Sequence, residues 1–329
     1  MSGKVALVTG AAGFLGSHLC DRLLADGFLV IGMDNLSTGN MGNLEAALKN
    51  NNFIFWEKDL TEIGIDSLEK DIGKVMGSGK SLSHVFHMAS PASPIHYQRL
   101  GIETMLVNGL GTYYLAELAV RTGARFVLAS TSEVYGDPEV SPQPETYWGR
   151  VNPNGPRSCY DESKRFAEAL ALEYVKRCGL EAVLVRIFNT YGPRMAKDDG
   201  RMIPNFIQQC LEGVPMTIYG DGRQTRSLVF VEDEVEGIVR LANLPQVPPG
   251  PVNVGSDEEH RVLEIADLVA KVVGVKSNYR FVSLPQDDPK RRRPELTKIR
   301  ELVNWRPIIQ LGEGIRSTVR WFKDTYVSG

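Results

Sequence analysis

The sequence predicts an α/β fold, with a doubly wound parallel sheet and a smaller carboxyl-terminal lobe. Short apolar runs rich in β-branched residues, beginning with residues 5–9, alternate with helical patterns through the first 190 residues. A glycine-rich turn over residues 10–16 joins the first of these runs to the first helical pattern. With 329 residues, 43% of them hydrophobic, the chain can bury a core large enough for one or two domains.

Composition and charge exclude several classes of protein. The net charge of −3 and the pI near 6.0 lack the basic footprint of a nucleic-acid binder, so no nucleic-acid partner is expected. The one dense basic run, residues 290–293, follows directly after two aspartates. No signal-peptide pattern and no membrane-spanning apolar run is present, which predicts a cytoplasmic protein that does not contact membranes.

The cysteines predict neither a metal site nor a disulfide framework. The chain has four, at Cys20, Cys159, Cys178 and Cys210. Their spacing matches no zinc pattern and no disulfide framework. Reduced thiols, as in a cytosolic protein, are the expected state.

The first 34 residues have the order of a dinucleotide-binding unit. The strand 5–9, the glycine turn 10–16, a helix from residue 17 and a second strand over 28–33 lead to Asp34. The glycines allow a tight turn and a close approach to pyrophosphate, and the helix N-terminus favours phosphate. Asp34 can accept hydrogen bonds from ribose hydroxyls and would repel a 2′-phosphate, so NAD is expected rather than NADP. This is the Rossmann-type arrangement, and its predicted cofactor residues are Gly10, Gly13, Phe14, Leu15, Gly16, Asp34 and Asn35.

Further strands are expected at residues 53–56, 84–89, 125–131, 182–188 and 252–255, with a long helix over 104–122. The second of these strands runs up to Ala89 and the small residues 90–94, which suit a close approach to the cofactor. Asp59 and Leu60 follow the strand 53–56 and are expected near the adenine. The strand 125–131 delivers Ser132 and Glu133 at its carboxyl end, where open α/β sheets bind ligands.

Tyr160 and Lys164 are predicted to form a proton-transfer pair. At spacing i and i+4 they share one face of a helix. An ammonium beside a phenol favours the phenolate and is expected to lower the pKa of the phenol. Tyr160 is therefore a candidate general base near neutral pH.

With these residues in place, the chain resembles an extended short-chain dehydrogenase/reductase that acts on nucleotide sugars. The glycine spacing over 10–16 and the set Thr131, Tyr160 and Lys164 carry the resemblance, which runs to about residue 307. Within that family it most resembles the UDP-glucuronic acid decarboxylases, over segments 130–138, 142–148, 157–164, 187–195 and 287–294. Related dehydratases carry Asp-Glu where this chain has Ser132 and Glu133, and the decarboxylases carry an arginine at the position of Arg292.

The resemblance implies NAD-dependent conversion of UDP-glucuronate to UDP-xylose through a UDP-4-keto sugar, redox-neutral overall. Tyr160 would remove the 4-hydroxyl proton, Lys164 would hold the nicotinamide ribose, and Thr131 would bond the 4-oxygen. A 4-ketone lies β to the carboxyl carbon, so carbon dioxide can leave. Arg292 would bind the carboxylate or position the water that protonates carbon 5. Glu133 would orient or repel the carboxylate or relay a proton, and Ser132 would hydrogen-bond it.

The resemblance also implies a UDP-sugar substrate site in the carboxyl-terminal part. Residues 217–227 look like the family's UDP-binding hairpin, with Arg226 on a phosphate and Tyr219 on the uracil side. The implied substrate residues are Asn189, Arg194, Arg201, Thr217, Tyr219, Arg226 and Arg292. The expected division is a Rossmann domain of residues 1–188 and 228–255, and a lobe of 189–227 and 256–329. A homodimer through the helices near 104–120 and 165–176 is expected.

Two departures and three alternatives remain open. Many decarboxylases have lysines at Glu103 and Leu106, and often a glycine at Ser163. The rivals are a UDP-glucuronate 4-epimerase, another NAD-dependent UDP-sugar epimerase or dehydratase, and an NAD-binding redox sensor. The intact set Thr131, Tyr160 and Lys164 argues against the sensor.

Overall fold

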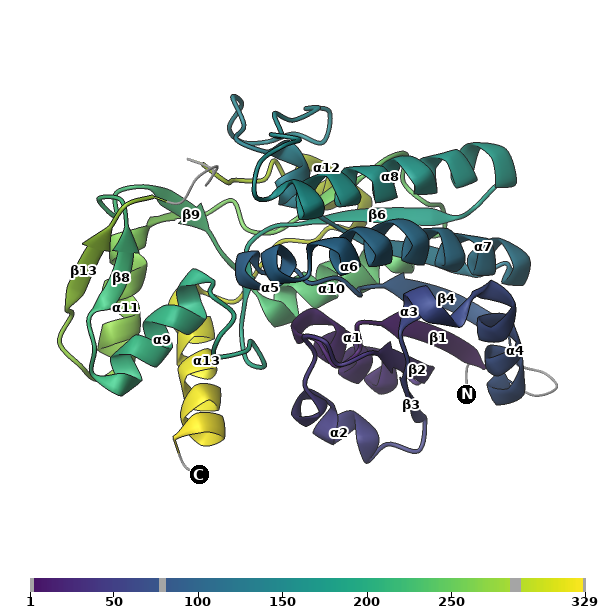
Figure 1. Ribbon diagram of the computed structural model, residues 1–329, viewed down its shortest axis with the longest axis horizontal. Coiled ribbons are helices and arrows are strands. Elements are labelled where there is room, and N and C mark those ends of the chain that lie inside the picture. Colours follow the sequence, from purple (N-terminus) through teal and green to yellow (C-terminus); the bar gives the residue numbers. More distant parts are fainter. Residues whose placement is uncertain (1–2, 77–80, 285–290, 328–329) are drawn as a thin grey trace.

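The computed structural model describes residues 3–76, 81–284 and 291–327, and its centre is a seven-stranded parallel sheet (Figure 1). The spatial order is β11-β6-β5-β4-β1-β2-β3, and every neighbouring pair is parallel. This order is the doubly wound arrangement, so the predicted fold class is confirmed. The strands are β1 (Lys4–Thr9), β2 (Leu29–Asp34), β3 (Phe53–Glu57), β4 (Ser81–His87), β5 (Arg125–Thr131), β6 (Ala182–Ile187) and β11 (Val252–Val254).

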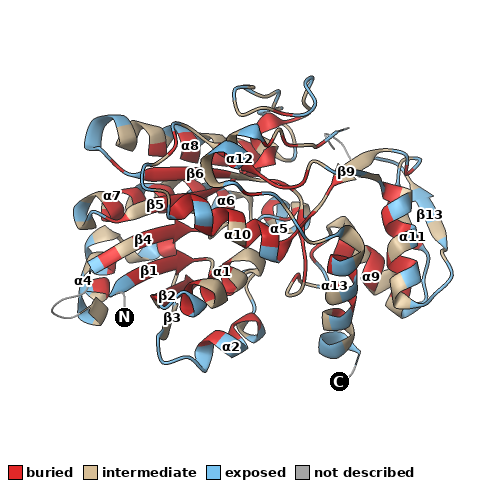
Figure 2. Cartoon of the chain, turned by 180° about the vertical axis from the view of Figure 1, so that it is seen from behind, coloured by how far each residue is buried: buried red, intermediate tan, exposed pale blue. Residues whose placement is uncertain are grey.

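Helices cover both faces of the sheet, which leaves its strands buried (Figure 2). In β1, Ala6 and Val8 belong to one apolar cluster, whereas Val5 and Leu7 belong to the other. This alternation follows from the two-residue period of a strand. The first cluster includes side chains of α1 (Phe14–Ala25) and α10 (Val231–Ala242). The second includes α4 (Ile65–Met76), α7 (Thr112–Thr122) and α8 (Ser158–Cys178).

The helix predicted over residues 104–122 forms, with an interruption. It consists of α6 (Gly101–Leu106), a π-helical turn η2 (Val107–Gly111) and α7. The His87 ring nitrogen Nε2 lies 3.2 Å from the Val107 carbonyl oxygen in this turn. π-helical turns occur often at functional sites. The remaining short helices are η1 (Met41–Leu44), α2 (Glu45–Leu48), α3 (Leu60–Ile63), α5 (Pro94–Arg99) and η3 (Ser132–Tyr135).

The carboxyl-terminal elements form a second layer at one end of the sheet (Figure 1). α11 (Val262–Val273) packs against both α9 (Met202–Glu212) and α13 (Leu311–Tyr326). β8 (Met216–Tyr219) pairs in parallel with β13 (Tyr279–Val282), and β9 (Thr225–Ser227) pairs antiparallel with β12 (Glu259–Arg261). The expected hairpin over residues 217–227 is therefore wrong. Its two arms bond to later segments of the chain instead of to each other.

The two layers meet through short segments. β7 (Thr190–Tyr191) pairs in parallel with β10 (Val229–Phe230), directly before α10 returns to the sheet. α12 (Thr297–Val303), assigned to the lobe by the expected division, contacts β11 and α10 of the sheet. The division into domains stays a prediction. Over the described residues, no helix combines the length and apolarity that crossing a membrane requires.

Glu234 in α10 is fully buried, and neither of its carboxylate oxygens has a hydrogen-bond partner within the described chain. Burial raises its pKa well above the ordinary glutamate value; the nearby Thr190 side chain lowers the pKa but makes no hydrogen bond of normal geometry. The folded state therefore retains the Glu234 proton to a higher pH than the unfolded state. The contribution of Glu234 to stability is therefore fully present below its unfolded-state pKa and is lost as pH rises through the raised pKa.

Glu234→Gln, which cannot ionise, should remove this loss. At pH 8 the free energy of unfolding should exceed that of the wild type by on the order of 1–3 kcal/mol, and the gain should shrink toward pH 5. Urea unfolding at both pH values measures it, with the exposed neighbour Glu232→Gln as control. An equal effect of Glu234→Gln at both pH values would contradict a buried neutral acid.

Candidate active site

One cavity of about 830 Å³ opens at the carboxyl ends of the sheet strands, between the sheet and the carboxyl-terminal elements. All the residues predicted to bind cofactor or substrate, or to act in catalysis, line this cavity. They come from segments between Gly10 and Arg292, far apart in the sequence. Part of one predicted segment, residues 287–290, lies outside the described residues. The structure brings the predicted residues together, and their individual roles stay predictions.

The glycine turn leaves room for a dinucleotide. Gly10 has φ +69°, and a Cβ there would lie 2.8 Å from the Ala89 backbone; a Cβ on Gly16 would lie 2.0 Å from the Gly10 carbonyl oxygen. α1 begins after Gly13 without a side-chain cap, so its first amides face the cavity region unshielded. Backbone amides at a helix N-terminus suit pyrophosphate, and these residues therefore fit an NAD phosphate group.

Asp34 supports the same turn as well as facing the cavity. Its Oδ2 accepts from the Ala12 amide at 2.9 Å, and its Oδ1 accepts from the Leu36 amide at 2.8 Å. Burial raises the pKa of Asp34, and the amide hydrogen bonds lower it. Farther along the cavity, Asp59 accepts from the Asn35 side chain at 2.7 Å. These bonds fix both carboxylates at the ends of β2 and β3.

Tyr160 and Lys164 share one face of α8, as predicted, and both are buried. The expected lowering of the Tyr160 pKa is wrong: burial raises it to about 12, although a hydrogen bond with Thr131 and the charge of Arg201 lower it. Burial lowers the pKa of Lys164 to about 7. The Lys164 ammonium donates to the Ala129 carbonyl oxygen at 2.7 Å. Helical spacing placed the pair, but desolvation favours the neutral form of both groups.

Tyr97 is a cavity residue that the sequence analysis missed. Its ring stacks on Tyr160 with centroids 5.0 Å apart and planes 6° from parallel. Burial raises its pKa, and its hydroxyl has no hydrogen-bond partner in the described part of the chain. A buried hydroxyl beside the candidate base is an available donor to a ligand. Its helix α5 begins at Pro94 with Ser93 as cap, a local signal of its position.

Glu133 lies between two guanidinium groups. Arg157 forms a short ion pair with its Oε2, and Arg292 Nη2 lies 3.0 Å from the same oxygen. Burial opposes ionisation, but Arg292 and Arg157 together lower the pKa of Glu133. Arg292 is only 2% exposed and also donates to the carbonyl oxygens of Ser132 and Gly136. Arg292 is thus a buried partner of Glu133, and it meets the Ser132 carbonyl instead of its hydroxyl.

Arg157, also missed, stands three residues before Tyr160 as the cap residue of α8. We name Arg157, Glu133 and Arg292 the Arg-Glu-Arg cluster. The two positive charges mean that Glu133 does not present an uncompensated negative charge to the cavity. A purely repulsive role for Glu133 toward a carboxylate is therefore disfavoured.

The predicted substrate residues take up several kinds of contact. Arg201 holds Asp199 through both guanidinium ends, and Arg194 pairs with Asp21 of α1 at 2.6 Å. Thr217 is fixed by Gln209 of α9, whose amide donates to its hydroxyl at 3.0 Å. Three further residues of this set also line the cavity: Asn189, Tyr219 and Arg226. Arg226 donates to the Thr225 carbonyl oxygen, and Tyr219 is 42% exposed.

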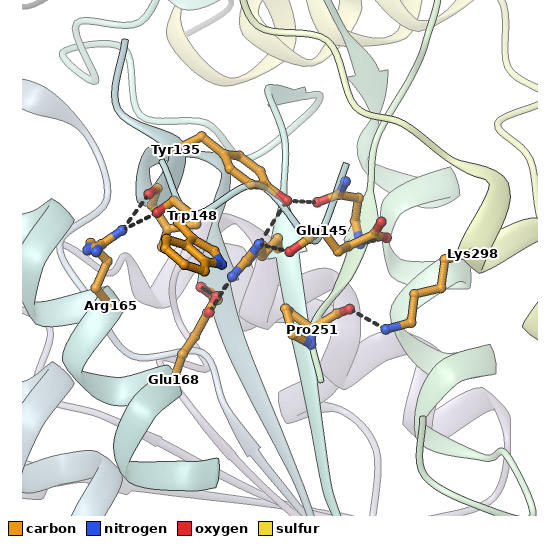
Figure 3. Close-up of polar contacts among 11 residues, drawn as sticks. Tyr135, Glu145, Trp148, Arg165, Glu168, Pro251 and Lys298 are labelled. Atoms are coloured by element: carbon orange, nitrogen blue, oxygen red, sulfur yellow. Dashed lines mark hydrogen bonds and ion pairs between the residues drawn. The ribbon is translucent and has the colours of Figure 1, made fainter. Parts of the chain in front are cut away.

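A network of buried polar side chains connects α8 to the strands next to the cavity (Figure 3). Glu168 of α8 accepts two hydrogen bonds from Arg186 of β6, at 2.9 and 2.8 Å, and a third from Ser130 of β5. Arg186 also donates to the Tyr135 hydroxyl at 2.9 Å, and that hydroxyl donates to Asn253 of β11 at 2.8 Å. The network ties α8 to β5, β6 and β11, and its member Ser130 is next to Thr131 in the chain.

Gly10→Ala should weaken NAD binding by at least about tenfold, because the new methyl group must displace the Ala89 backbone or the turn. Gly27→Ala is a matched control: its φ is also positive, at +82°, but a Cβ there meets nothing within 4 Å. Both variants carry the cost of a left-handed alanine, and only the first changes the cavity. Calorimetric titration with NAD measures the difference. Equal affinities would show that the turn does not contact the cofactor.

Comparison with known proteins agrees with this geometry. The family model "NAD dependent epimerase/dehydratase family" matches residues 6–255. UDP-glucuronic acid decarboxylase 1 of Danio rerio is 45% identical over 97% of this chain and 72% of its own length. UDP-glucuronic acid decarboxylase 2 of Arabidopsis thaliana is 46% identical, over 98% and 68%.

Among solved structures, UDP-glucuronic acid 4-epimerase from Bacillus cereus, with UDP-glucuronic acid and NAD, has a TM-score of 0.85. It is 27% identical and covers 98% of this chain and 100% of that one. UDP-glucose 4-epimerase from Thermotoga maritima, with UDP-glucose, has a TM-score of 0.86 at 27% identity, over 98% and 99%. The chain therefore belongs to the NAD-dependent epimerase/dehydratase family, the extended short-chain dehydrogenases/reductases.

Proposed function

We propose that this chain is a UDP-glucuronate decarboxylase that uses bound NAD to convert UDP-glucuronate to UDP-xylose through a UDP-4-keto sugar. The observation that carries the proposal is the Arg-Glu-Arg cluster beside Tyr160 in one cavity. Relatives named UDP-glucuronic acid decarboxylase, about 45% identical over nearly the whole chain, support it.

In the first half of the proposed reaction, Tyr160 removes the proton from the sugar 4-hydroxyl. NAD held at the glycine turn would supply the hydride acceptor for carbon 4 and the same hydride for its later reduction. Thr131, whose side chain hydrogen-bonds Tyr160, would also bond the 4-oxygen as it becomes a ketone. Lys164, with a pKa near 7, can exchange a proton at neutral pH and would hold the nicotinamide ribose.

The second half follows from the position of the ketone. A 4-ketone lies β to the carboxyl carbon, so the bonding electrons move onto the ketone oxygen as carbon dioxide leaves. The Arg-Glu-Arg cluster would orient the carboxylate, because guanidinium groups match carboxylate geometry. Carbon 5 then needs a proton, which we assign to a water that Arg292 positions; Glu133, ionised between its two arginines, could orient that water and relay its proton. Ser132 would help hold the carboxylate.

The predicted contacts of the cofactor and nucleotide fit the same cavity. Gly10, Gly13, Phe14, Leu15 and Gly16 would face the pyrophosphate. Asp34 and Asn35 would hold the adenosine ribose, with Asp59, Leu60 and Ala89 along the adenine and the chain that leads to the nicotinamide. The UDP group would lie against Arg226. The other predicted substrate residues line the same cavity, and they are Asn189, Arg194, Arg201, Thr217 and Tyr219. Tyr97 and Arg157 join them as residues that face the sugar.

We also infer a homodimer in the cytosol. Ile102 and Met105 of α6, Tyr113 of α7 and Phe166 of α8 are large apolar side chains between 42% and 73% exposed. α8 contacts both α6 and α7, so these side chains belong to adjoining helices. An apolar surface of this kind suits a second copy of the chain. Four free cysteines agree with a reducing compartment.

Incubation with UDP-glucuronate and catalytic NAD tests the function directly. The expected products are carbon dioxide and UDP-xylose, identified by NMR, without net formation of NADH. A product that retains the carboxylate with inverted carbon 4 would instead indicate a 4-epimerase, which the structural likeness to the Bacillus cereus epimerase makes the relevant rival. If the protein bound NAD but converted no UDP-sugar, the result would favour an NAD-binding redox sensor over an enzyme.

Tyr160→Phe should lower turnover by about 10²–10⁴-fold, since it removes the group that takes the 4-hydroxyl proton. NAD affinity should be unchanged. Tyr174→Phe is the matched control, because it deletes a hydroxyl on the same helix that bonds Glu117 outside the cavity. Steady-state rates and NAD titration separate the two. Retained turnover in Tyr160→Phe would exclude it as the base.

Arg292→Ala should reduce carbon dioxide release by at least about 100-fold while changing UDP affinity much less, because it leaves Glu133 paired with one cation. Arg292→Lys keeps the positive charge but cannot bond a carboxylate through two nitrogens, so its rate of carbon dioxide release should lie between those of the wild type and Arg292→Ala. Arg291→Ala is the control in the same basic run, since Arg291 is exposed. Thermal melts show whether each variant is folded. Full activity in folded Arg292→Ala would remove Arg292 from the mechanism.

A further inference from the structure

Asp161 is buried in the first turn of α8, one helical turn after Arg157 of the Arg-Glu-Arg cluster, and its amide donates to the Arg157 carbonyl oxygen at 3.0 Å. Its side chain is 5% exposed, and its Oδ1 has no hydrogen-bond partner among the described residues. It lies outside the residues that line the cavity. A helix N-terminus favours a negative charge, and an aspartate there would ordinarily be ionised. A buried carboxylate oxygen without a partner instead favours the neutral acid.

The charged groups around Asp161 come from several elements. Burial and the charge of Glu133 raise the pKa of Asp161 to about 7, against the lowering effect of Arg157 and Arg292. Glu162, next along its own helix, adds to the rise. The phenols of Tyr97 and Tyr160 also lie within electrostatic range. Glu133 remains ionised because the two arginines hold it directly.

We propose that Asp161 is a positioning residue that acts through the Arg-Glu-Arg cluster: as an uncharged acid, it spares the cluster one negative charge and so favours a substrate with a carboxylate at carbon 5. This proposal rests on the proposed function for the identity of that carboxylate. Ionisation of Asp161 would add one negative charge beside Glu133. The cluster would then attract a uronate less, while an uncharged sugar would be affected little.

The consequence is a pH-dependent preference between two ligands that differ at carbon 5. UDP-glucuronate carries a carboxylate there, and UDP-glucose carries an uncharged hydroxymethyl group. The ratio of their affinities cancels the effects that are common to both ligands, such as ionisation of the UDP group. For one linked proton, the preference for UDP-glucuronate should fall by up to about tenfold per pH unit above neutrality.

Calorimetric titration of both ligands from pH 6 to pH 9 tests this, on the full chain loaded with NADH, which cannot accept hydride. In the wild type, the preference should fall as pH rises. In Asp161→Asn, whose side chain is similar in size and always neutral, it should stay high and flat. Glu162→Gln is the matched control, because Glu162 is partly exposed and pairs with Arg165 at 3.5 Å. Its preference should still fall with rising pH, from a slightly lower pH, since the charge of Glu162 no longer raises the pKa of Asp161.

A pH-independent preference in the wild type would overturn the proposal, and this holds even if Asp161→Asn does not fold. The same pH dependence in folded Asp161→Asn would also overturn it. If the preference behaves as expected but no carbon dioxide is released from UDP-glucuronate with NAD⁺, the proposed reaction fails while the role of Asp161 stands. If carbon dioxide is released and the preference is flat, only the role of Asp161 fails.

Discussion

The ion pair between Arg186 and Glu168 is the interaction on which the site depends. Both side chains are close to nine-tenths buried, and both guanidinium and carboxylate are bonded at each end. Removing either partner would leave a buried, uncompensated charge, a cost of about 3–5 kcal/mol in comparable cases. The pair joins α8 to β6, and Ser130 joins the same carboxylate to β5. These bonds fix the position of α8, which carries Tyr160 and Lys164, relative to the strand that carries Thr131.

The same network shows how a site on loops is kept rigid. Tyr135 ends the short turn that begins at Ser132, and its hydroxyl is held by Arg186 and Asn253. Asn253 in turn donates to the carbonyl oxygens of Gln143 and Glu295. The turn that presents Glu133 directly follows β5 and is held at Tyr135 by side chains of β6 and β11. The reacting groups need not become ordered when a ligand arrives.

Local patterns were sufficient to predict the sheet, the glycine turn and the cavity residues at the ends of the strands, whereas Arg292 and the other substrate residues were predicted from the family resemblance. The strands are short buried runs, and Gly10, Gly16 and Asp34 follow from constraints within 25 residues of one another. The carboxyl ends of parallel strands meet at one edge, which is why Asp59, Ala89 and Ser132 could be placed in a common site before any contact was known.

What sequence reasoning missed depends on contacts between distant segments. The expected hairpin was wrong because β8 and β9 find their partners at β13 and β12. The stacking of Tyr97 on Tyr160 joins residues 63 positions apart, and no periodicity reports it. The Tyr160 pKa was mispredicted because spacing along a helix says nothing about burial. Asp161 went unremarked beside Tyr160, since only packing against the turn at Ser132 makes an ordinary acid unusual.

The way Arg292 reaches Glu133 has a consequence for biosynthesis. The neighbouring Arg293 is clamped to buried Gln143 by two backbone-mediated bonds of 2.8 Å, so the segment that carries Arg292 is fitted onto a surface formed 150 residues earlier. On a ribosome, the glycine turn and the strands β1 to β6 are made by residue 187, well before this segment, and only β11 of the sheet is made later. The segments that form the dinucleotide turn are therefore made first, and Glu133 has only Arg157 as its cationic partner until residue 292 has been made.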